Sequence, residues 1–510
     1  MLCYLAEITA YDASIGGTRT LYYSTDGYTS LPSDTPANQH YEARLDQPGL
    51  MRRDIYSQGT TAGSSTTGYG VLELINLGDL DALANYGFDG RQFRILLGDS
   101  EAALSTFSVI LSGTMEQPEF TFAKLTIRIR DRLAELDKTC QSVLYTGTNS
   151  GASGLEGTAS DIKGHPKPKL FGQVFNISPP LVNSSQLIYQ ISDSAIQSID
   201  AVYDQGVALT AGAAYSSISD MTTNAPTAGQ YRVYAAGGYL RLGSSPVGQL
   251  TCDATQGATT AARTTAQILK SLALLSGTVL SADIYSADVT ALDAAASAPI
   301  GIWLSNGENI KSAMDEVATS VGAWFGFDRL GRLRMGQLTV PTGSPVLTLT
   351  EQDISEMERT ATADTDKGVP AYQVRLGYQR NYTVVQQDFK AGITQDRVNW
   401  LAQDYRMVSA TDVATQTVHL LAPVIERNTL LVNAADAATE CARVLALYKD
   451  RRDHLTVKTR VNAGINSAID LTDTVKVQIN RFGYNSGKLF RVIGIQPDYR
   501  IGKLELTLWG

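Results

Sequence analysis

The sequence has few of the residues from which metal sites and disulfide frameworks are built. Its 510 residues include only four cysteines, which are Cys3, Cys140, Cys252 and Cys441. They lie far apart and form no Cys-x-x-Cys pair. A zinc site needs clustered thiolates or imidazoles, and a disulfide framework needs more closely spaced cysteines. We therefore expect four isolated, buried or partly buried thiols.

Recognisable catalytic motifs are also absent from the sequence. The four histidines, His40, His165, His419 and His454, show no metal-ligand spacing such as His-x-His. There is no Gly-x-Ser-x-Gly elbow and no phosphate-binding P-loop. We expect no enzymatic activity, no metal and no cofactor.

One catalytic alternative stays open because acidic residues are plentiful. Two carboxylates that meet in a cleft can hydrolyse a glycan, and Asp328, Asp353, Asp470 and Asp473 are examples of available acids. The chain has 51 acidic residues, so chance pairs are unavoidable. A cell-wall hydrolase is therefore the least favoured of the functions considered.

Charge and long apolar runs are scarce as well. Charged residues make up 18% of the chain, and the net charge is −9. A mildly acidic chain has no overall electrostatic reason to bind nucleic acid or an anionic membrane. No run approaches the ~20 apolar residues of a membrane-spanning helix, and the first residues lack the pattern of a secretory signal. We expect a chain made in the cytoplasm that stays soluble or assembles there.

The residues that are abundant indicate β structure. The 44 glycines and 24 tyrosines, with many serines and threonines, are typical of a loop-rich β protein. The length suggests several domains. We predict a mainly β, multi-domain chain with a few helices. The expected parts are a β-rich domain over 1–145, a middle β-rich region over 146–345 that ends in a helix and hairpin, and a β-rich domain over 346–510 with one long helix.

Several local patterns support this organisation. Tyr231–Tyr234 and Tyr239–Leu242 flank a Gly-Gly pair and predict a hairpin. Residues 147–159 are rich in Gly, Ser and Thr, which predicts a linker or exposed loop. Lysines and prolines alternate from Lys163 to Gly172, so this segment is expected to be extended. We favour a solvated domain entry there over an anion or partner contact.

The stretch Asn309–Leu338 is the most organised part of the sequence. Its first half places apolar residues at helical spacing up to Gly322, where a helix can stop. An aromatic strand with Trp324 and Phe327 follows, and a turn ending in Gly331 leads into a second alternating strand. We expect Trp324 and Phe327 to hold the helix against the sheet as a local core.

Two more helices are predicted with their limits. Thr264–Leu275 has a helical pattern followed by a stop at Gly277. Asn433 is a suitable N-cap for a helix over Ala434–Lys449, and Asp436 complements the positive end of its dipole. Strand patterns follow to the end of the sequence and predict a meander or a small barrel.

These stretches together resemble the tail-tip or baseplate hub proteins of long-tailed (siphovirus-like) bacteriophages, prophages and gene transfer agents. Residues 23–28, 70–76 and 86–91 are similar to the N-terminal domain of such proteins, and 163–174 and 199–204 to their middle part. Residues 309–338 are similar to the hub pattern of a helix before a strand that ends in Asp-x-x-Gly. Residues 434–443 and 504–510 are similar to the C-terminal hub segment.

The resemblance implies a structural virion protein at the tail tip, assembled in the host cytoplasm and built of small β-barrel or β-sandwich domains. Hub proteins form a ring, commonly a trimer, that closes the tail tube. They join the distal tail protein to fibre or receptor-binding proteins, and they surround the end of the tape measure protein. The main alternative is a receptor- or glycan-binding tail protein, to which the many tyrosines point.

Overall fold

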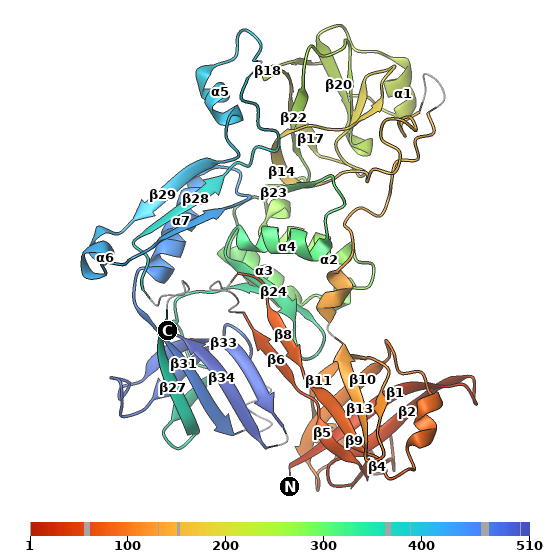
Figure 1. Cartoon of the computed structure of the whole chain (residues 1–510), viewed down its shortest axis with the longest axis vertical. Helices are drawn as coiled ribbons and strands as arrows, with labels where there is room; N and C mark the ends of the chain where they lie inside the picture. Colours follow the sequence, from red (N-terminus) through yellow and green to blue (C-terminus); the bar gives the residue numbers. More distant parts are fainter. Residues whose placement is uncertain are drawn as a thin grey trace.

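The computed structural model describes residues 2–55, 62–130, 132–149, 154–362, 369–387, 389–460, 469–499 and 501–510. These residues form six β-sheets and a smaller number of helices, so the mainly β, multi-sheet prediction is confirmed. Figure 1 shows two sheets side by side in the lower half, a helical middle layer and an upper β lobe. No sheet closes into a barrel within the described residues.

The first sheet contains most of the N-terminal part of the chain. Its strand order is β3 (Tyr28–Thr29), β4 (His40–Ala43), β2 (Gly17–Ser24), β1 (Leu2–Asp12), β10 (Gln92–Asp99), β11 (Ser108–Met115), β13 (Lys124–Arg130), β9 (Val71–Ile75) and β5 (Leu45–Pro48). The short strand β12 (Glu119–Phe120) pairs with β13. The continuous alternation that the sequence shows over 120–129 is thus broken by a turn, in which the Thr121 hydroxyl accepts the Lys124 N–H at 2.9 Å.

The second sheet joins distant parts of the sequence. Its order is β26 (Leu347–Thr350), β32 (Thr474–Gln478), β33 (Lys488–Asp498), β34 (Lys503–Trp509), β31 (Arg452–Arg460) and β27 (Ile354–Thr362). The expected C-terminal meander is present as β32, β33 and β34. Two N-terminal strands extend it, because β6 (Met51–Asp54) pairs with β33 and β8 (Thr66–Tyr69) pairs with β6. The first and second sheets also share one continuous hydrophobic cluster.

The upper lobe contains two five-stranded sheets. One has the order β18 (Val207–Ala208), β17 (Ser198–Asp204), β22 (Leu250–Thr255), β14 (Lys169–Ile177) and β23 (Gly301–Leu304). The other has the order β15 (Leu181–Asn183), β16 (Ile188–Gln190), β21 (Tyr239–Leu242), β20 (Gln230–Tyr234) and β19 (Thr210–Ala211). The predicted hairpin is β20–β21, and its turn uses Gly238 at a φ of +71°, a conformation that glycine adopts without strain.

Two three-stranded sheets lie between these parts. The first is β25 (Leu333–Gln337), β24 (Ala323–Phe327) and β7 (Gly63–Ser64). The second is β29 (Arg406–Thr411), β28 (Gln373–Tyr378) and β30 (Val424–Asn428), which has α7 packed on one face. A segment near residue 60 thus contributes strands to two sheets formed mainly by residues beyond 320. The boundaries at 145 and 345 remain a prediction.

The α-helices are α1 (Ile218–Thr223), α2 (Thr265–Leu274), α3 (Ser286–Ala295), α4 (Ile310–Thr319), α5 (Gln395–Leu401), α6 (Val413–Val418) and α7 (Ala434–Tyr448). Short 3-10 segments are η1 (Asp81–Asn85), η2 (Leu104–Thr106), η3 (Arg132–Leu136), η4 (Ala235–Gly237), η5 (Thr260–Arg263) and η6 (Ser281–Asp283). The predicted helices at α2, α4 and α7 are confirmed, and the Asn433 side chain accepts the Asp436 N–H at 2.9 Å as the expected N-cap. The sequence patterns missed α1, α5 and α6, which are each under two turns long.

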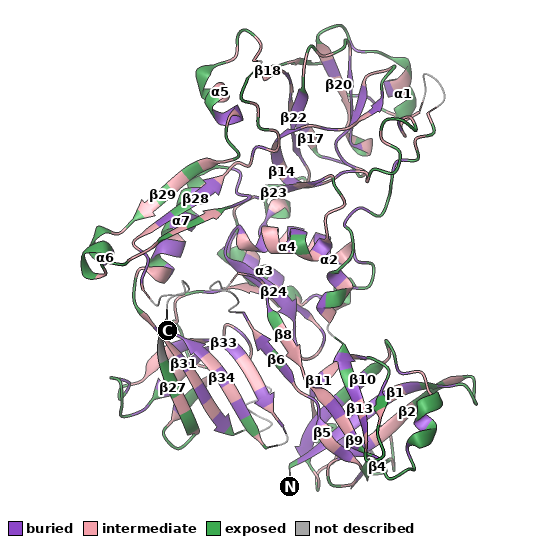
Figure 2. Cartoon of the chain, viewed as in Figure 1, coloured by how far each residue is buried: buried purple, intermediate pink, exposed green. Residues whose placement is uncertain are grey.

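Burial follows the sheets and the helical layer, as Figure 2 shows in purple. The helices α2, α3 and α4 share a hydrophobic cluster with the β24–β25 hairpin. No helix in the described ranges is long and apolar enough to cross a membrane.

Candidate functional site

The β24–β25 hairpin lies at the centre of the molecule and has two different buried faces. Phe325 and Phe327 point into the cluster that contains α4. Trp324 is 2% exposed and points the other way, toward Trp509 and Ile493 of the second sheet. Successive residues of a strand face opposite sides. Phe327 therefore packs in the cluster of the helix as expected, whereas Trp324 packs in a separate cluster with the second sheet.

The turn of the hairpin contacts the first sheet. Gly331 has a φ of +74°, which places it in the left-handed region, and its N–H donates to the Asp328 carbonyl at 2.9 Å. The Asp328 carboxylate accepts the N–H groups of Leu330 and Arg332, each at 2.9 Å. At the tip, the Arg329 carbonyl accepts the Ser112 N–H of β11 at 2.7 Å. The turn predicted to end in Gly331 is thus a bridge between elements far apart in the sequence.

A network of ion pairs fixes the same hairpin to helix α3 and to the second sheet. Arg334 of β25 pairs with Asp288 of α3 at 2.5 Å and also with Asp470. Asp470 pairs in addition with Arg53 of β6, whose side chain is only 5% exposed. Asp328 lies 3.8 Å from Arg334 in the same network. We call this set, Arg53, Asp288, Asp328, Arg334 and Asp470, the ionic junction.

The arginines control the charge state of the junction. Burial alone would raise the pKa of Asp470, but the Arg53 and Arg334 guanidiniums outweigh burial and lower this pKa from its ordinary value. The carboxylate is therefore ionised at neutral pH. Two of the acids considered for hydrolysis, Asp328 and Asp470, thus meet at Arg334, where they serve as partners in ion pairs.

The other two acids have local structural contacts. Asp353 accepts the Thr350 N–H at 2.9 Å in a surface turn. Asp473 accepts the Asp470 N–H at 2.7 Å, and burial raises its pKa. Among the described residues there is no group of three or more His, Cys, Asp or Glu side chains placed to hold a metal ion.

The cysteines are free and buried, as predicted. Burial raises the pKa of the Cys140 thiol to about 12, so almost none of it is thiolate at neutral pH. Two of the three lysines of the 163–172 segment form ion pairs within the chain. Lys167 pairs with Glu156 at 2.5 Å, and Lys169 pairs with Asp193 at 2.6 Å. The predicted loop over 147–159 lies partly outside the described residues.

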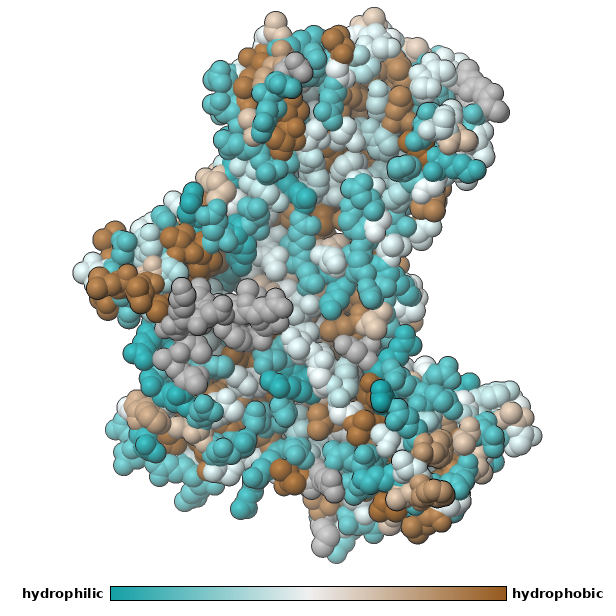
Figure 3. Space-filling view, viewed as in Figure 1, coloured by the Kyte–Doolittle hydropathy of each residue, from teal (hydrophilic) through white to brown (hydrophobic). Residues whose placement is uncertain are grey.

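The tip formed by α6 and the chain after it carries a group of exposed aliphatic side chains. Four aliphatic side chains are exposed by 67% to 90%, and they are Val413, Val418, Leu420 and Leu421. Figure 3 shows brown hydrophobic atoms at the left edge, where Figure 1 places α6. We call these four residues the α6 apolar tip. Exposed apolar patches of this kind commonly mark contacts with other proteins.

Polar contacts fix the start of α6 to the end of α7, on the side of α6 that faces the rest of the chain. Asp412 accepts the Thr415 N–H at 3.2 Å as the N-cap of α6. Lys449, just after α7, pairs with Asp412 at 2.9 Å, and its carbonyl accepts the Thr415 hydroxyl at 3.3 Å. These bonds fix the orientation of the helix. The aliphatic side chains therefore face solvent in a defined arrangement.

Strand edges beside the tip add hydrogen-bonding capacity. In the order β29, β28, β30, the two outer strands each pair on one side only within the described residues. An unpaired edge presents N–H and C=O groups that can bind another strand.

Sequence reasoning missed the α6 apolar tip, although a signal was present. From residue 413 to 425 the chain has no Asp, Glu, Lys or Arg, in a sequence with 18% charged residues. A short uncharged run can be a buried strand or an exposed contact, and only the fold distinguishes the two.

Comparison with known proteins gives matches among solved structures only. No protein-family model matches the sequence, and no curated protein matches it. A tail protein from Neisseria meningitidis MC58 is similar at 11% identity and a TM-score of 0.41, over 92% of this chain and 93% of that one. The 43 kDa tail protein of prophage MuSo2 from Shewanella oneidensis has the same identity and TM-score, over 92% of this chain and 96% of that one.

A chain of the virion of a native gene transfer agent particle is similar at 14% identity and a TM-score of 0.44. The similarity covers 74% of this chain and 91% of that one. The solved structures with similarity to this chain thus include a bacterial tail protein, a prophage tail protein and a chain of a gene transfer agent virion.

Proposed function

We propose that this chain is a structural component of a phage-type tail, and that it acts as a tail-tip or baseplate hub. In this role it forms a ring, commonly a trimer, that closes the tail tube and joins the distal tail protein to fibre or receptor-binding proteins. The ring surrounds the end of the tape measure protein. The protein acts through binding and has no catalytic role.

The assignment to tails follows from the sequence resemblance of residues 309–338 and the other hub-like stretches. The observation that carries the assembly role is the α6 apolar tip with the unpaired edges of β29 and β30. A chain that works alone in water has no use for four aliphatic side chains held outward by Asp412, Thr415 and Lys449. A ring of identical chains needs two different surfaces on each copy, which meet head to tail.

The ionic junction suits the same role. It ties strand β6, helix α3 and hairpin strand β25 together through buried or half-buried pairs. Such pairs fix geometry even where their net stabilisation is small. A ring closes only if every copy presents its two contact surfaces at the same angle, so the parts of each copy must keep a constant orientation.

The test is assembly with an altered tip. Leu420→Asp combined with Leu421→Asp is expected to leave the fold intact, since exposed substitutions usually change the free energy of unfolding by about 0.5 kcal/mol or less. The double variant is expected to be lost from tail particles when it replaces the original chain in the genome that encodes it. Electron microscopy and mass spectrometry of purified particles measure this.

The matched control is Val247→Asp, a substitution of another aliphatic residue that is 73% exposed and lies away from the tip. We expect normal incorporation of this variant. Normal tails that contain the Leu420/Leu421 double variant at full occupancy would contradict the assembly role of the tip.

A further inference from the structure

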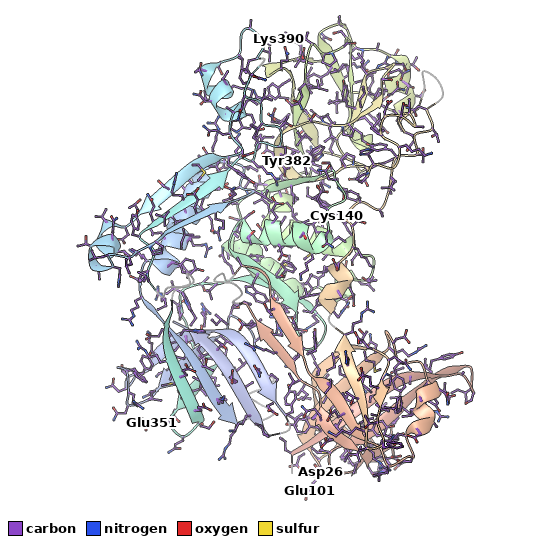
Figure 4. All side chains as sticks on the ribbon, viewed as in Figure 1. Asp26, Glu101, Cys140, Glu351, Tyr382 and Lys390 are labelled. Carbon is purple, nitrogen blue, oxygen red and sulfur yellow. The ribbon has the colours of Figure 1, made fainter. Side chains whose placement is uncertain are left out.

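The upper lobe contains a cleft of about 710 Å³ that the assembly role does not use. One wall comes from the end of β14, the turn after β17 and the chain leading into β22. The other wall comes from residues 384–387 and the end of α5. Figure 4 labels Tyr382 and Lys390, which bracket this second wall in the upper half of the molecule. The volume is in the usual range for small-ligand sites.

The lining of this cleft combines polar and aliphatic side chains and carries no formal charge among the described residues. It contains five side-chain amides, from Asn176, Gln205, Gln249, Gln386 and Gln387. We call it the amide cleft. Each amide offers both a donor and an acceptor. A lining of this kind matches an uncharged ligand whose groups both donate and accept hydrogen bonds.

Two carboxylates behind the walls are held by protein donors, and the Arg397 guanidinium behind Gly206 donates to the carbonyl of that residue at 3.3 Å. Asp204 accepts the Gly248 N–H at 3.0 Å and pairs with Lys390 at 3.2 Å. Asp253 accepts the Asn176 N–H at 2.8 Å and the Tyr203 hydroxyl at 2.9 Å. Their charges are therefore held by protein donors. A ligand in the cleft would meet amides and glycine backbone rather than these carboxylates.

The Gln205 side chain packs directly against the backbone of residue 248, which is possible because this residue is glycine. A Cβ atom on residue 248 would lie 2.3 Å from Cγ of Gln205 and 2.6 Å from its Nε2. Any other residue would therefore displace this side chain. Within the described chain the side-chain amides of Gln205, Gln386 and Gln387 make no protein hydrogen bond, so their donors and acceptors remain available.

The floor of the cleft has one acceptor without a partner. Asn176 is fully buried, and its Nδ2 donates to the Asn381 Oδ1 at 2.8 Å and to the Thr383 carbonyl at 2.6 Å. Its Oδ1 accepts no hydrogen bond within the described residues. A buried polar atom without a partner is rare in folded proteins and indicates a missing donor.

We propose that the amide cleft binds a neutral saccharide unit. Sugar hydroxyls both donate and accept, as do the amides that line the cleft, and its volume suits one or two sugar rings. The absence of charge from the lining disfavours acidic sugars, which would lose hydration without gaining a cationic partner. The proposal is independent of the hub role, since the cleft is formed within one chain.

The test is saturation-transfer NMR and calorimetry on the purified, folded chain. The probes are N-acetylglucosamine and glucose as neutral sugars, N-acetylneuraminic acid as a charged sugar and N-acetyl-triglycine amide as a neutral peptide. We expect signal from at least one neutral sugar and none from the charged sugar or the peptide. Gln205→Ala and Gln386→Ala are each expected to weaken sugar binding by about three- to tenfold, the loss of one hydrogen bond.

Gln416→Ala is the matched control, because Gln416 is an exposed glutamine on α6 outside the cleft. Its sugar binding should equal that of the original chain. The proposal is overturned if the folded chain binds neither neutral sugar, if it prefers the peptide or the charged sugar, or if the two cleft variants bind as well as the control. None of these results bears on tail assembly, which the α6 variants test separately.

Discussion

Asp470 shows at the level of single residues how the molecule holds its parts together. Its carboxylate contacts Arg53 from the N-terminal part of the chain and Arg334 from the central hairpin. The Nε and Nη2 atoms of Arg53 have no hydrogen-bond partner in the described structure. Asp470 is therefore the counter-ion of the Arg53 guanidinium and its main hydrogen-bond partner. Removing the carboxylate would leave a buried guanidinium without a counter-ion.

Asp470→Asn is therefore expected to lower the free energy of unfolding by about 3–5 kcal/mol, the usual cost of breaking a buried ion pair on one side. Chemical denaturation followed by circular dichroism measures this. Glu426→Gln is the control, because Glu426 pairs with Arg375 at an exposed site and should contribute about 1 kcal/mol or less. Equal effects of the two substitutions would contradict a structural role for the junction.

The same carboxylate makes stability depend on pH in a defined direction. The folded pKa of Asp470 is lowered, so the folded state binds its proton less readily than the unfolded state does. Its contribution is present above the unfolded pKa, which is about 3.9 for Asp, and is lost as the pH falls through the lower folded value. In the Asp470→Asn variant, the free energy of unfolding should therefore fall less steeply as the pH decreases below about 4.

At the scale of elements, the β24–β25 hairpin joins three regions through its two faces and its tip. The sequence predicted the helix, the aromatic strand and the turn at Gly331, because their periodicities are local. It could not predict that Trp324 packs on the second sheet, because its partners there, Ile493 and Trp509, lie far away in the chain. Alternation shows that Trp324 and Phe327 face opposite sides, but not which element covers each side.

Trp324→Ala is expected to destabilise the protein by about 3–5 kcal/mol through the cavity that it leaves. Trp324→Phe should cost clearly less, because it keeps an aromatic ring and removes an indole N–H that has no partner in the described structure. Thermal and denaturant unfolding of both variants measure the difference. If Trp324→Ala were as stable as the original chain, the hairpin would not be the organising element.

The pairing of distant segments also limited what the sequence could show. The strands near residue 60 have short, mostly polar sequences without an alternating apolar pattern, yet β6 and β8 join the second sheet through β33. Nothing local distinguishes a strand that stays in its own sheet from one that crosses to another. The α6 apolar tip was missed for a related reason, because hydrophobic residues are normally interpreted as core. The amide cleft combines residues from 176 to 401, which no spacing rule connects.

At the scale of the whole molecule, the chain is elongated and built of several sheets (Figure 1). It has an outward apolar tip, strand edges that are unpaired within the described residues, and a central ionic junction. These features suit a component that is completed by copies of itself and by other proteins. We expect the purified chain to be incomplete as a monomer and its position in a particle to be fixed. Our central claim is that this position is the tip of a phage-type tail.

The most direct measurement is electron microscopy of tail particles in which this chain carries a small affinity label bound by gold. We expect label at one end of the tail tube, at the tip and away from the head, in a number of copies that fits a closed ring. Label along the tube, label at the head end, or intact tails that lack the chain altogether would contradict the account.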